Sequence, residues 1–339
     1  KPVDTVFPPD VTIDQAAGQV DPTGTSPINF TVVFTRSVTG FDGSDVDLSG
    51  TANPTTAVVT EAAPNDGTTF NVAVSGMTAN GTVIASIPAN VVDGENRAST
   101  SMDNTVTYNN TAPTIVVAAG GMCGTSNGTL NLLLTDAEGD PLNLSGTSSN
   151  TSAVPNANIV FGGSGLNRSV TITGVPAATI RTANITVTVS DGINTSAVTI
   201  RVMVGTAGND LLVGSSGADL LLGFNGHNTF FALGGKDLLC GGHGNDTMFA
   251  GDGDDTLFSG SGNDILFGGN GSDTLDAGAG RDVVDGGPGD DILLGGDNND
   301  VVIGGSGNDS LNGGNGNDTC HGGSGTDSSS ACEVRISIP

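Results

Sequence analysis

The chain has 339 residues, a formal net charge of −27 at pH 7 and 54 glycines. Its excess of carboxylates argues against nucleic acids and anionic membranes as partners, because both require patches of Lys and Arg, and it favours cations. With no Trp, one Tyr and three His, the chain has few of the residues that build catalytic pockets, and we expect no enzymatic activity. No apolar run approaches the roughly 18 residues of a membrane-spanning helix, so no membrane span is expected.

Residues 1–112 are predicted to form a β-sandwich. Apolar and polar residues alternate in short runs, for example at Ile28, Phe30 and Val32, and about seven such runs are separated by Gly, Pro, Asn and Asp. The stretches VTIDQAAGQVDPTGTSPINFTVVFT and DGTTFNVAVSGMTANGTVIASIP resemble bacterial immunoglobulin-like repeats of surface proteins. That resemblance implies a spacer or adhesive module.

Residues 113–204 are predicted to form a second sandwich of seven strands, after a hinge at Pro113. The pieces DAEGDPLNLSG and VTVSDG resemble bacterial cadherin-like or immunoglobulin-like surface domains. Asp136, Glu138 and Asp140 bring three carboxylates into one loop. This loop is either a calcium site, since Ca²⁺ takes oxygen ligands, or an acidic turn between strands.

Residues 205–330 consist of one nonapeptide written fourteen times without insertion or deletion, for example GGNGSDTLD at 268–276. Position four is Gly in every copy except at Asn298, and position eight is apolar in the first twelve copies. Position six is Asp in thirteen copies and Asn228 in the other. These aspartates are Asp210, Asp219, Asp237, Asp246, Asp255, Asp264, Asp273, Asp282, Asp291, Asp300, Asp309, Asp318 and Asp327.

This period predicts a parallel β-roll with two nonapeptides in each coil. The glycines permit a tight turn whose carbonyls point to a common centre, the Asp adds a carboxylate, and the last three residues form a strand with position eight inward. One copy buries nothing alone, so stability must come from stacking. Because stacking repeats like charges one coil apart, the roll is expected to fold only with divalent cations.

The repeat GGxGxDxUx resembles the calcium-binding nonapeptide of RTX proteins. The resemblance implies a right-handed β-roll in which several Ca²⁺ ions lie between neighbouring coils, each held by position-six Asp and turn carbonyls. Position two departs from Gly in the first four copies, and position six departs from Asp at Asn228. We therefore expect better occupancy from about Asp237 onward.

Position nine of the odd-numbered copies places an apolar ladder on one outer face. Phe231, Phe249 and Phe267 follow one another on this face. The ladder is either cross-strand packing that stiffens the sheet or a docking surface for another domain or subunit.

Four cysteines suggest two bridges. Cys320 is at an inward position and Cys332 lies just past the last copy, so a bridge between them would close the open end of the roll. A Cys123–Cys240 bridge would clamp the second sandwich to the roll, with two free thiols as the alternative. The tail, residues 331–339, is predicted to be a capping strand or an added strand on a neighbouring sheet.

The sequence therefore predicts an all-β fold with two immunoglobulin-like sandwiches followed by a calcium-bound β-roll. We expect a non-enzymatic extracellular structural protein, such as a surface-layer, filament or adhesin subunit, that self-associates at the cell surface. The alternative is the non-catalytic export, folding and spacer region of a secreted enzyme or toxin. Because RTX proteins of the type I export route carry a long segment after the repeats and tend to lack Cys, we expect an N-terminal signal removed before Lys1.

Overall fold

The computed structural model describes residues 8–92 and 96–336. Its regular structure there consists of β-strands and two short 3-10 turns, η1 (Gly43–Asp45) and η2 (Asn156–Asn158), which confirms the predicted all-β class. Within these residues no helix is long and apolar enough to cross a membrane. The chain forms two compact units, the first of which contains the described residues up to Pro113 and the loops Asp136–Leu142 and Ser190–Thr195.

The first unit contains seven strands in the segments predicted from alternation. They are β1 (Val11–Gln15), β2 (Ile28–Phe34), β3 (Asp47–Ser49), β4 (Thr56–Glu61), β5 (Thr69–Ser75), β6 (Gly81–Ser86) and β7 (Thr105–Tyr108). Four of them form the antiparallel sheet β1-β2-β5-β4 and three form β3-β6-β7. Alternate side chains such as Ile28, Phe30 and Val32 are completely buried. This arrangement is consistent with an immunoglobulin-like sandwich.

The second unit begins with seven further strands. They are β8 (Thr114–Cys123), β9 (Asn127–Thr135), β10 (Asn143–Ser148), β11 (Ile159–Ser164), β12 (Asn167–Thr173), β13 (Arg181–Ser190) and β14 (Thr195–Val204). One sheet has the order β11-β12-β9-β8, and β10-β13-β14 begin the other. These sheets are also consistent with an immunoglobulin-like domain.

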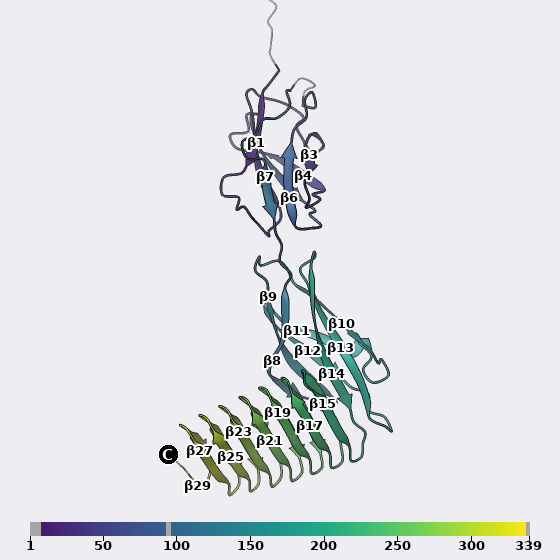
Figure 1. Ribbon diagram of the computed structural model, residues 1–339, viewed down its shortest axis with the longest axis vertical. Helices are drawn as coiled ribbons and strands as arrows, with labels where there is room; N and C mark the ends of the chain where they lie inside the picture. Colours follow the sequence, from purple (N-terminus) through teal and green to yellow (C-terminus); the bar gives the residue numbers. More distant parts are fainter. Residues whose placement is uncertain (1–7, 93–95, 337–339) are drawn as a thin grey trace, which may run out of the picture. The chain divides into compact units, whose positions relative to one another are not determined.

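The remaining strands form the stacked rungs of a β-roll (Figure 1). They are β15 (Leu211–Ser215), β16 (Asp219–Leu222), β17 (Thr229–Gly234), β18 (Leu238–His243), β19 (Thr247–Asp252), β20 (Thr256–Ser261), β21 (Ile265–Asn270), β22 (Thr274–Asp276), β23 (Val283–Pro288), β24 (Ile292–Asp297), β25 (Val301–Ser306), β26 (Ser310–Asn315), β27 (Thr319–Ser324), β28 (Ser328–Ser330) and β29 (Val334–Ile336). Odd-numbered strands form one parallel sheet and even-numbered strands the other.

The register of the roll confirms that two nonapeptides make one coil. Leu212 pairs with Phe230, and Phe230 pairs with Met248, so each step along a sheet is one coil of two repeats. The position-eight side chains meet between the two sheets and form a single buried row that includes Leu266 and Leu293. Each repeat therefore contributes about one side chain to the core.

The sheet that contains the even-numbered rungs continues directly from the second sandwich. Its order is β10-β13-β14-β16-β18 and so on to β28. Arg201 of β14 pairs in parallel with Asp219 of β16, which repeats the register found between rungs, and Met203 belongs to the core of the roll. The domain bounds predicted at 112/113, 204/205 and 330/331 stay predictions, but β14 serves both the sandwich and the roll.

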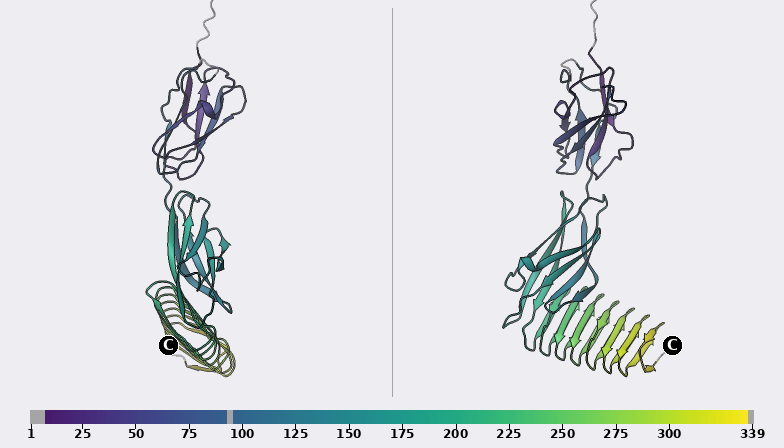
Figure 2. Two further views of the ribbon diagram at one scale, coloured as in Figure 1. Left: turned by 90° about the vertical axis from the view of Figure 1, so that its right-hand side faces the viewer. Right: turned by 180° about the vertical axis from the view of Figure 1, so that it is seen from behind.

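We call the outer surface of the sheet of even-numbered strands the even-numbered face of the roll, and that of the other sheet the odd-numbered face. The second sandwich covers the even-numbered face over its first rungs. Strands β8 and β9 lie against β16, β18 and β20, and Figure 2 shows the second sandwich next to the first rungs of the roll. Leu220, Leu222 and Leu238 are at outward positions of the repeat, yet each is at most 2% exposed. The predicted bridge between Cys123 and Cys240 is present there, with a Cα–Cα distance of 5.7 Å.

The C-terminal end of the roll is closed by a disulfide and a strand. Cys320 is bonded to Cys332, as predicted, and both contribute to the core of the roll. β29 pairs in parallel with β27, with Thr319 opposite Val334. The predicted tail strand is thus found at Val334–Ile336 as an added rung, while residues 337–339 lie outside the described residues.

Candidate metal sites along the β-roll

The position-six carboxylates form two rows, one along each edge of the roll. In each row a carboxylate oxygen accepts a hydrogen bond from the backbone N–H of the position-six residue one coil earlier. Asp246 N–H donates to Oδ1 of Asp264 at 2.7 Å, and Asp255 N–H donates to Oδ1 of Asp273 at 2.8 Å. The same bond reaches Asp237, Asp246, Asp255, Asp282, Asp291, Asp300, Asp309, Asp318 and Asp327.

The second oxygen of most of these carboxylates is buried and has no hydrogen-bond partner. This applies to Oδ1 of Asp219 and to Oδ2 of Asp237, Asp246, Asp255, Asp264, Asp273, Asp282, Asp291, Asp300, Asp309 and Asp318. Burying an unpaired charge costs several kcal/mol or more. The roll therefore presents a repeated, unsatisfied requirement for positive charge.

Because a desolvated carboxylate is disfavoured, burial raises the pKa of Asp219, Asp237, Asp246, Asp255, Asp264, Asp273, Asp282, Asp291, Asp300 and Asp309. The pKa of Asp237 is raised to about 9, by desolvation first and then by the neighbouring charge of Asp255. The pKa values of Asp246, Asp273 and Asp282 are raised to about 7 by the same leading cause. Without a cation, ionised carboxylates at these positions oppose folding at neutral pH.

Asn228 shows which groups surround a position-six side chain. Its amide Nδ2 donates to the carbonyl oxygens of Asn225 and Gly226, at 3.5 Å each. In the other copies a carboxylate replaces this amide and has no hydrogen to offer the turn carbonyls. A carboxylate oxygen facing carbonyl oxygens is the set of hard oxygen donors that Ca²⁺ takes, so the position-six residues fit a calcium ion.

The small residue at position one of the repeat leaves space beside the position-six carboxylate. A Cβ atom at Gly268 would lie 2.5 Å from Oδ2 of Asp273 and 2.6 Å from the carbonyl oxygen of Gly286. Only Gly, Ala or Ser occurs at position one in the fourteen copies. The small residue and the carbonyl of the next coil thus belong to the same site as the carboxylate, a role that the sequence alone did not assign.

The first copy satisfies both oxygens of its carboxylate, and the second copy satisfies one. Thr206 donates its N–H to Oδ2 of Asp210 at 2.6 Å and its hydroxyl to Oδ1 at 2.9 Å. Ser215 donates its N–H and hydroxyl to Oδ2 of Asp219 at 2.6 and 2.9 Å. These internal bonds reduce the need for an ion at Asp210 and Asp219, while the expectation that occupancy improves from about Asp237 onward stays a prediction.

The acidic loop of the second sandwich uses its carboxylates differently. Oδ1 of Asp136 accepts the N–H of Gly139 in its own turn, and Asp140 accepts an amide hydrogen bond from Asn110 at 2.6 Å. In the described part of the chain, no three His, Cys, Asp or Glu side chains are grouped to hold a metal. A metal in the roll must therefore take part of its ligands from the backbone. In the loop Oδ2 of Asp136 is also buried without a partner, so the calcium site and the acidic turn both stay predictions.

Two solved structures share low similarity with this chain. FdeC, an adhesin of Escherichia coli, is 17% identical over 58% of this chain and 63% of the FdeC chain, with a TM-score of 0.22. A chimeric titin Z1Z2 carrying a peptide from decorin is 12% identical over 59% of this chain and 94% of the titin chain, with a TM-score of 0.24. At these TM-scores neither supports a functional argument. No curated protein matches the chain.

The family described as RTX calcium-binding nonapeptide repeat (4 copies) matches the C-terminal region in overlapping segments between residues 204 and 328. These are the residues that form the roll and contribute both rows of carboxylates. The predicted resemblance is thus confirmed for the roll, and residues 204–328 of this chain are RTX calcium-binding nonapeptide repeats.

Proposed function

We propose that this chain is a non-enzymatic, extracellular structural protein whose roll becomes a rigid rod when Ca²⁺ occupies both edges. The observation that carries the proposal is the row of buried carboxylate oxygens without partners. Ions that bind only the folded roll stabilise it by mass action, by about 2.7 kcal/mol for each site at a concentration one hundred times its Kd. The two disulfides support an oxidising compartment.

The exposed odd-numbered face is the surface through which we propose that the rod self-associates. The rings of Phe231, Phe249 and Phe267 stack in parallel, with centroids 4.9 Å apart in both pairs. Phe231 is 37% exposed, and Leu211 in the neighbouring column is 56% exposed. The stacking supports the cross-strand packing that the sequence suggested, and the exposure leaves apolar area for a second subunit.

A comparison with the even-numbered face supports the proposal that the odd-numbered face is covered by another subunit. There, outward Leu220 and Leu238 are completely covered by the sandwich of the same chain. On the even-numbered face, the outward apolar residues of the repeat are thus covered by a domain of the same chain. We propose that the odd-numbered face is covered by another copy of the chain in a surface layer, filament or adhesive assembly.

Light scattering and negative-stain microscopy of the full chain test this function. Adding millimolar Ca²⁺ should produce assemblies, and a chelator should disperse them. Phe249→Ser should weaken assembly without changing calcium-dependent folding. Phe258→Ser, the same change at position nine on the even-numbered face, is the matched control and should assemble normally. A chain that folds with Ca²⁺ but stays monomeric would contradict self-association and favour the spacer region of a secreted enzyme or toxin.

A further inference from the structure

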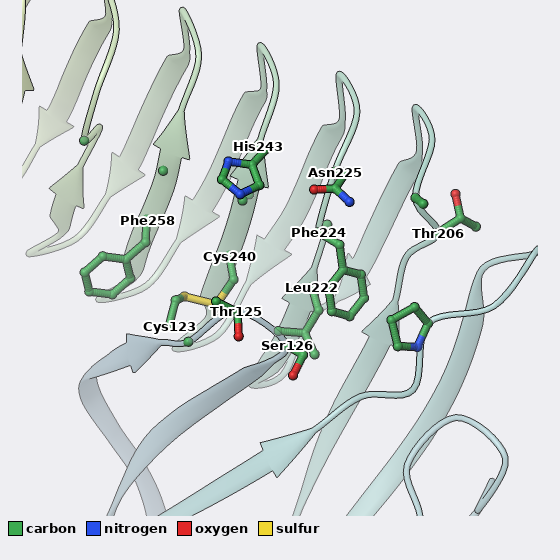
Figure 3. Close-up of a pocket in the computed structure, with 18 of the residues that line it drawn as sticks. Cys123, Thr125, Ser126, Thr206, Leu222, Phe224, Asn225, Cys240, His243 and Phe258 are labelled. Atoms are coloured by element: carbon green, nitrogen blue, oxygen red, sulfur yellow. A yellow bond between two sulfur atoms is a disulfide. The ribbon is translucent and has the colours of Figure 1, made fainter.

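A pocket of about 840 Å³ lies where the second sandwich meets the roll (Figure 3). One side is the β8–β9 turn, with Cys123, Thr125 and Ser126. The other is formed by position nine and by the following turns of the even-numbered rungs, including Leu222 and Phe258. The calcium edges do not use these side chains, so the pocket is a separate feature.

The pocket continues along the roll as a shallow groove. A second hollow, of about 660 Å³, shares Gly260 and Gly278 with the first and extends to Asn315 and Ala331. Its floor is made of successive glycine turns one coil apart. A hollow of this form suits a linear ligand that lies along the rungs more than a compact one.

The charge of the lining selects the kind of ligand. No Lys or Arg lines either hollow, whereas Asp276 and Asp297 do. Carboxylates without a cationic partner disfavour anionic ligands. The neighbouring hydroxyl and amide groups of Ser126 and Asn225 offer hydrogen bonds to a neutral ligand with several polar groups.

Two phenyl rings line the pocket on either side of the Cys123–Cys240 disulfide (Figure 3). Phe224 and Phe258 belong to turns and rungs separated by about two coils, or roughly 10 Å at the usual strand spacing. A ligand of two linked rings can contact both phenyl rings at this separation.

Phe224 occupies a backbone conformation that disfavours a bulky side chain. Its φ is 71°, in the left-handed region where Gly242, Gly260 and Gly278 follow at the same position of later coils. Non-glycine residues held there against their preference cluster at functional sites, although Leu233 has the same conformation outside the pocket. The disulfide beside it fixes the opposite wall, which reduces the ordering that binding requires.

We propose that this pocket binds a neutral linear glycan. The sugar-ring faces lie against Phe224 and Phe258, and sugar hydroxyls donate to the carboxylate of Asp276. This ligand combines three properties that suit the lining: no negative charge, flat apolar faces repeated along a chain, and many hydroxyl donors. The proposal is independent of self-association, since it uses the other face of the roll.

Isothermal titration of the calcium-loaded full chain with cellohexaose, laminarihexaose, mannohexaose and chitohexaose tests the proposal. We expect at least one of them to bind with a Kd of about 1 mM or lower. Phe224→Gly should weaken that binding at least about tenfold while the melting temperature stays the same or rises, because Gly suits a positive φ.

Leu233→Gly is the matched control. Leu233 also has a positive φ, 81°, at the same position of the next repeat, but it does not line the pocket. This variant should gain stability and bind the glycan as the unchanged chain does. Phe258→Ala and Asp276→Asn should each weaken binding.

Three results would overturn the proposal. The first is the absence of binding by all four oligosaccharides at about 10 mM. The second is equal binding by Phe224→Gly, Phe258→Ala and the unchanged chain. The third is preferential binding, sensitive to these variants, of hexagalacturonate or spermidine, which would assign the pocket to an anionic or a cationic ligand instead.

Discussion

The first sandwich and the β-roll consist of strands of similar length, but different forces hold them together. The sandwich has a contiguous apolar core in which Phe34, Phe41 and Phe70 pack edge to face at 5.1 to 5.9 Å. The roll has one inward side chain for each repeat, flanked by two rows of buried carboxylates. The first core is complete by itself, whereas the second is flanked by buried carboxylate oxygens that lack a partner.

Removing calcium should separate the two regions most clearly. In a chelator, we expect residues 205–330 to lose nearly all backbone protection, because each lost ion removes about 2.7 kcal/mol or more at saturating calcium. The first sandwich should keep its protection. Hydrogen-exchange mass spectrometry measures both regions in one sample, and equal protection of the roll with and without Ca²⁺ would contradict the central claim.

Cavity-forming substitutions should also distinguish the sandwich from the roll, by whether their effect on stability depends on calcium. Phe30→Ala should destabilise the first sandwich by about 3–5 kcal/mol, equally with Ca²⁺ and with a chelator. Leu266→Ala in the roll should cost about 2–5 kcal/mol, but only in Ca²⁺. Denaturant unfolding followed by region-specific exchange is the measurement. A calcium-dependent effect of Phe30→Ala would show that the sandwich is not independent.

Acid should affect the two regions in opposite directions when calcium is absent. The raised pKa of about 7 at Asp246 and Asp273 exceeds the value of about 3.9 for an unfolded Asp. The ion-free roll thus binds more protons than its unfolded state, so the stability present near pH 4 is lost as the pH rises through 7. In the sandwich, the backbone N–H of Met102 leads the lowering of the pKa of Asp14, so its contribution is present above pH 4 and lost in acid.

Circular dichroism of the chelated chain between pH 4 and 8, with exchange to locate the change, checks these signs. We expect the roll to regain structure as the pH falls. A roll that loses further structure in acid would show that the carboxylates are not buried in the ion-free chain.

Exchanging Asp and Asn at position six should have the smallest effect. Asp273→Asn should lower the number of bound ions and raise the calcium concentration at the folding midpoint about two- to threefold, near 0.5 kcal/mol, because the amide can donate to the turn carbonyls as Asn228 does. Asn228→Asp should do the reverse. Native mass spectrometry counts the ions, and an unchanged count in both variants would remove position six from the site.

The repeat period predicted most of the roll because the relevant information is local. Position eight inward and position six at the edge both follow from a pattern that any one copy contains. The different surroundings of the two oxygens of one carboxylate do not follow from the pattern, because one oxygen accepts a hydrogen bond from a residue of the previous coil. The bonds of Thr206 and Ser215 were readable as hydroxyls four residues before an Asp, but the sequence only marked them as departures.

The contact between sandwich and roll was harder to predict because it joins distant segments. Apolar residues at outward positions of the even-numbered copies, such as Leu220 and Leu238, were the available signal. Their meaning depends on where β8 and β9 lie, which no periodicity states. For the same reason the Cys123–Cys240 pairing was only one alternative, whereas Cys320–Cys332 followed from the need to close an open end.

The double role of β14 has a consequence for how the roll forms. A stack of repeats is slow to begin, because the first rung has no partner to template it, and quick to extend. Here the sandwich holds β14 in register with β16, and both oxygens of the first carboxylate, Asp210, accept hydrogen bonds from Thr206. The chain thus carries a ready-made nucleus, from which ordering would spread rung by rung toward the C-terminus as each cation arrives.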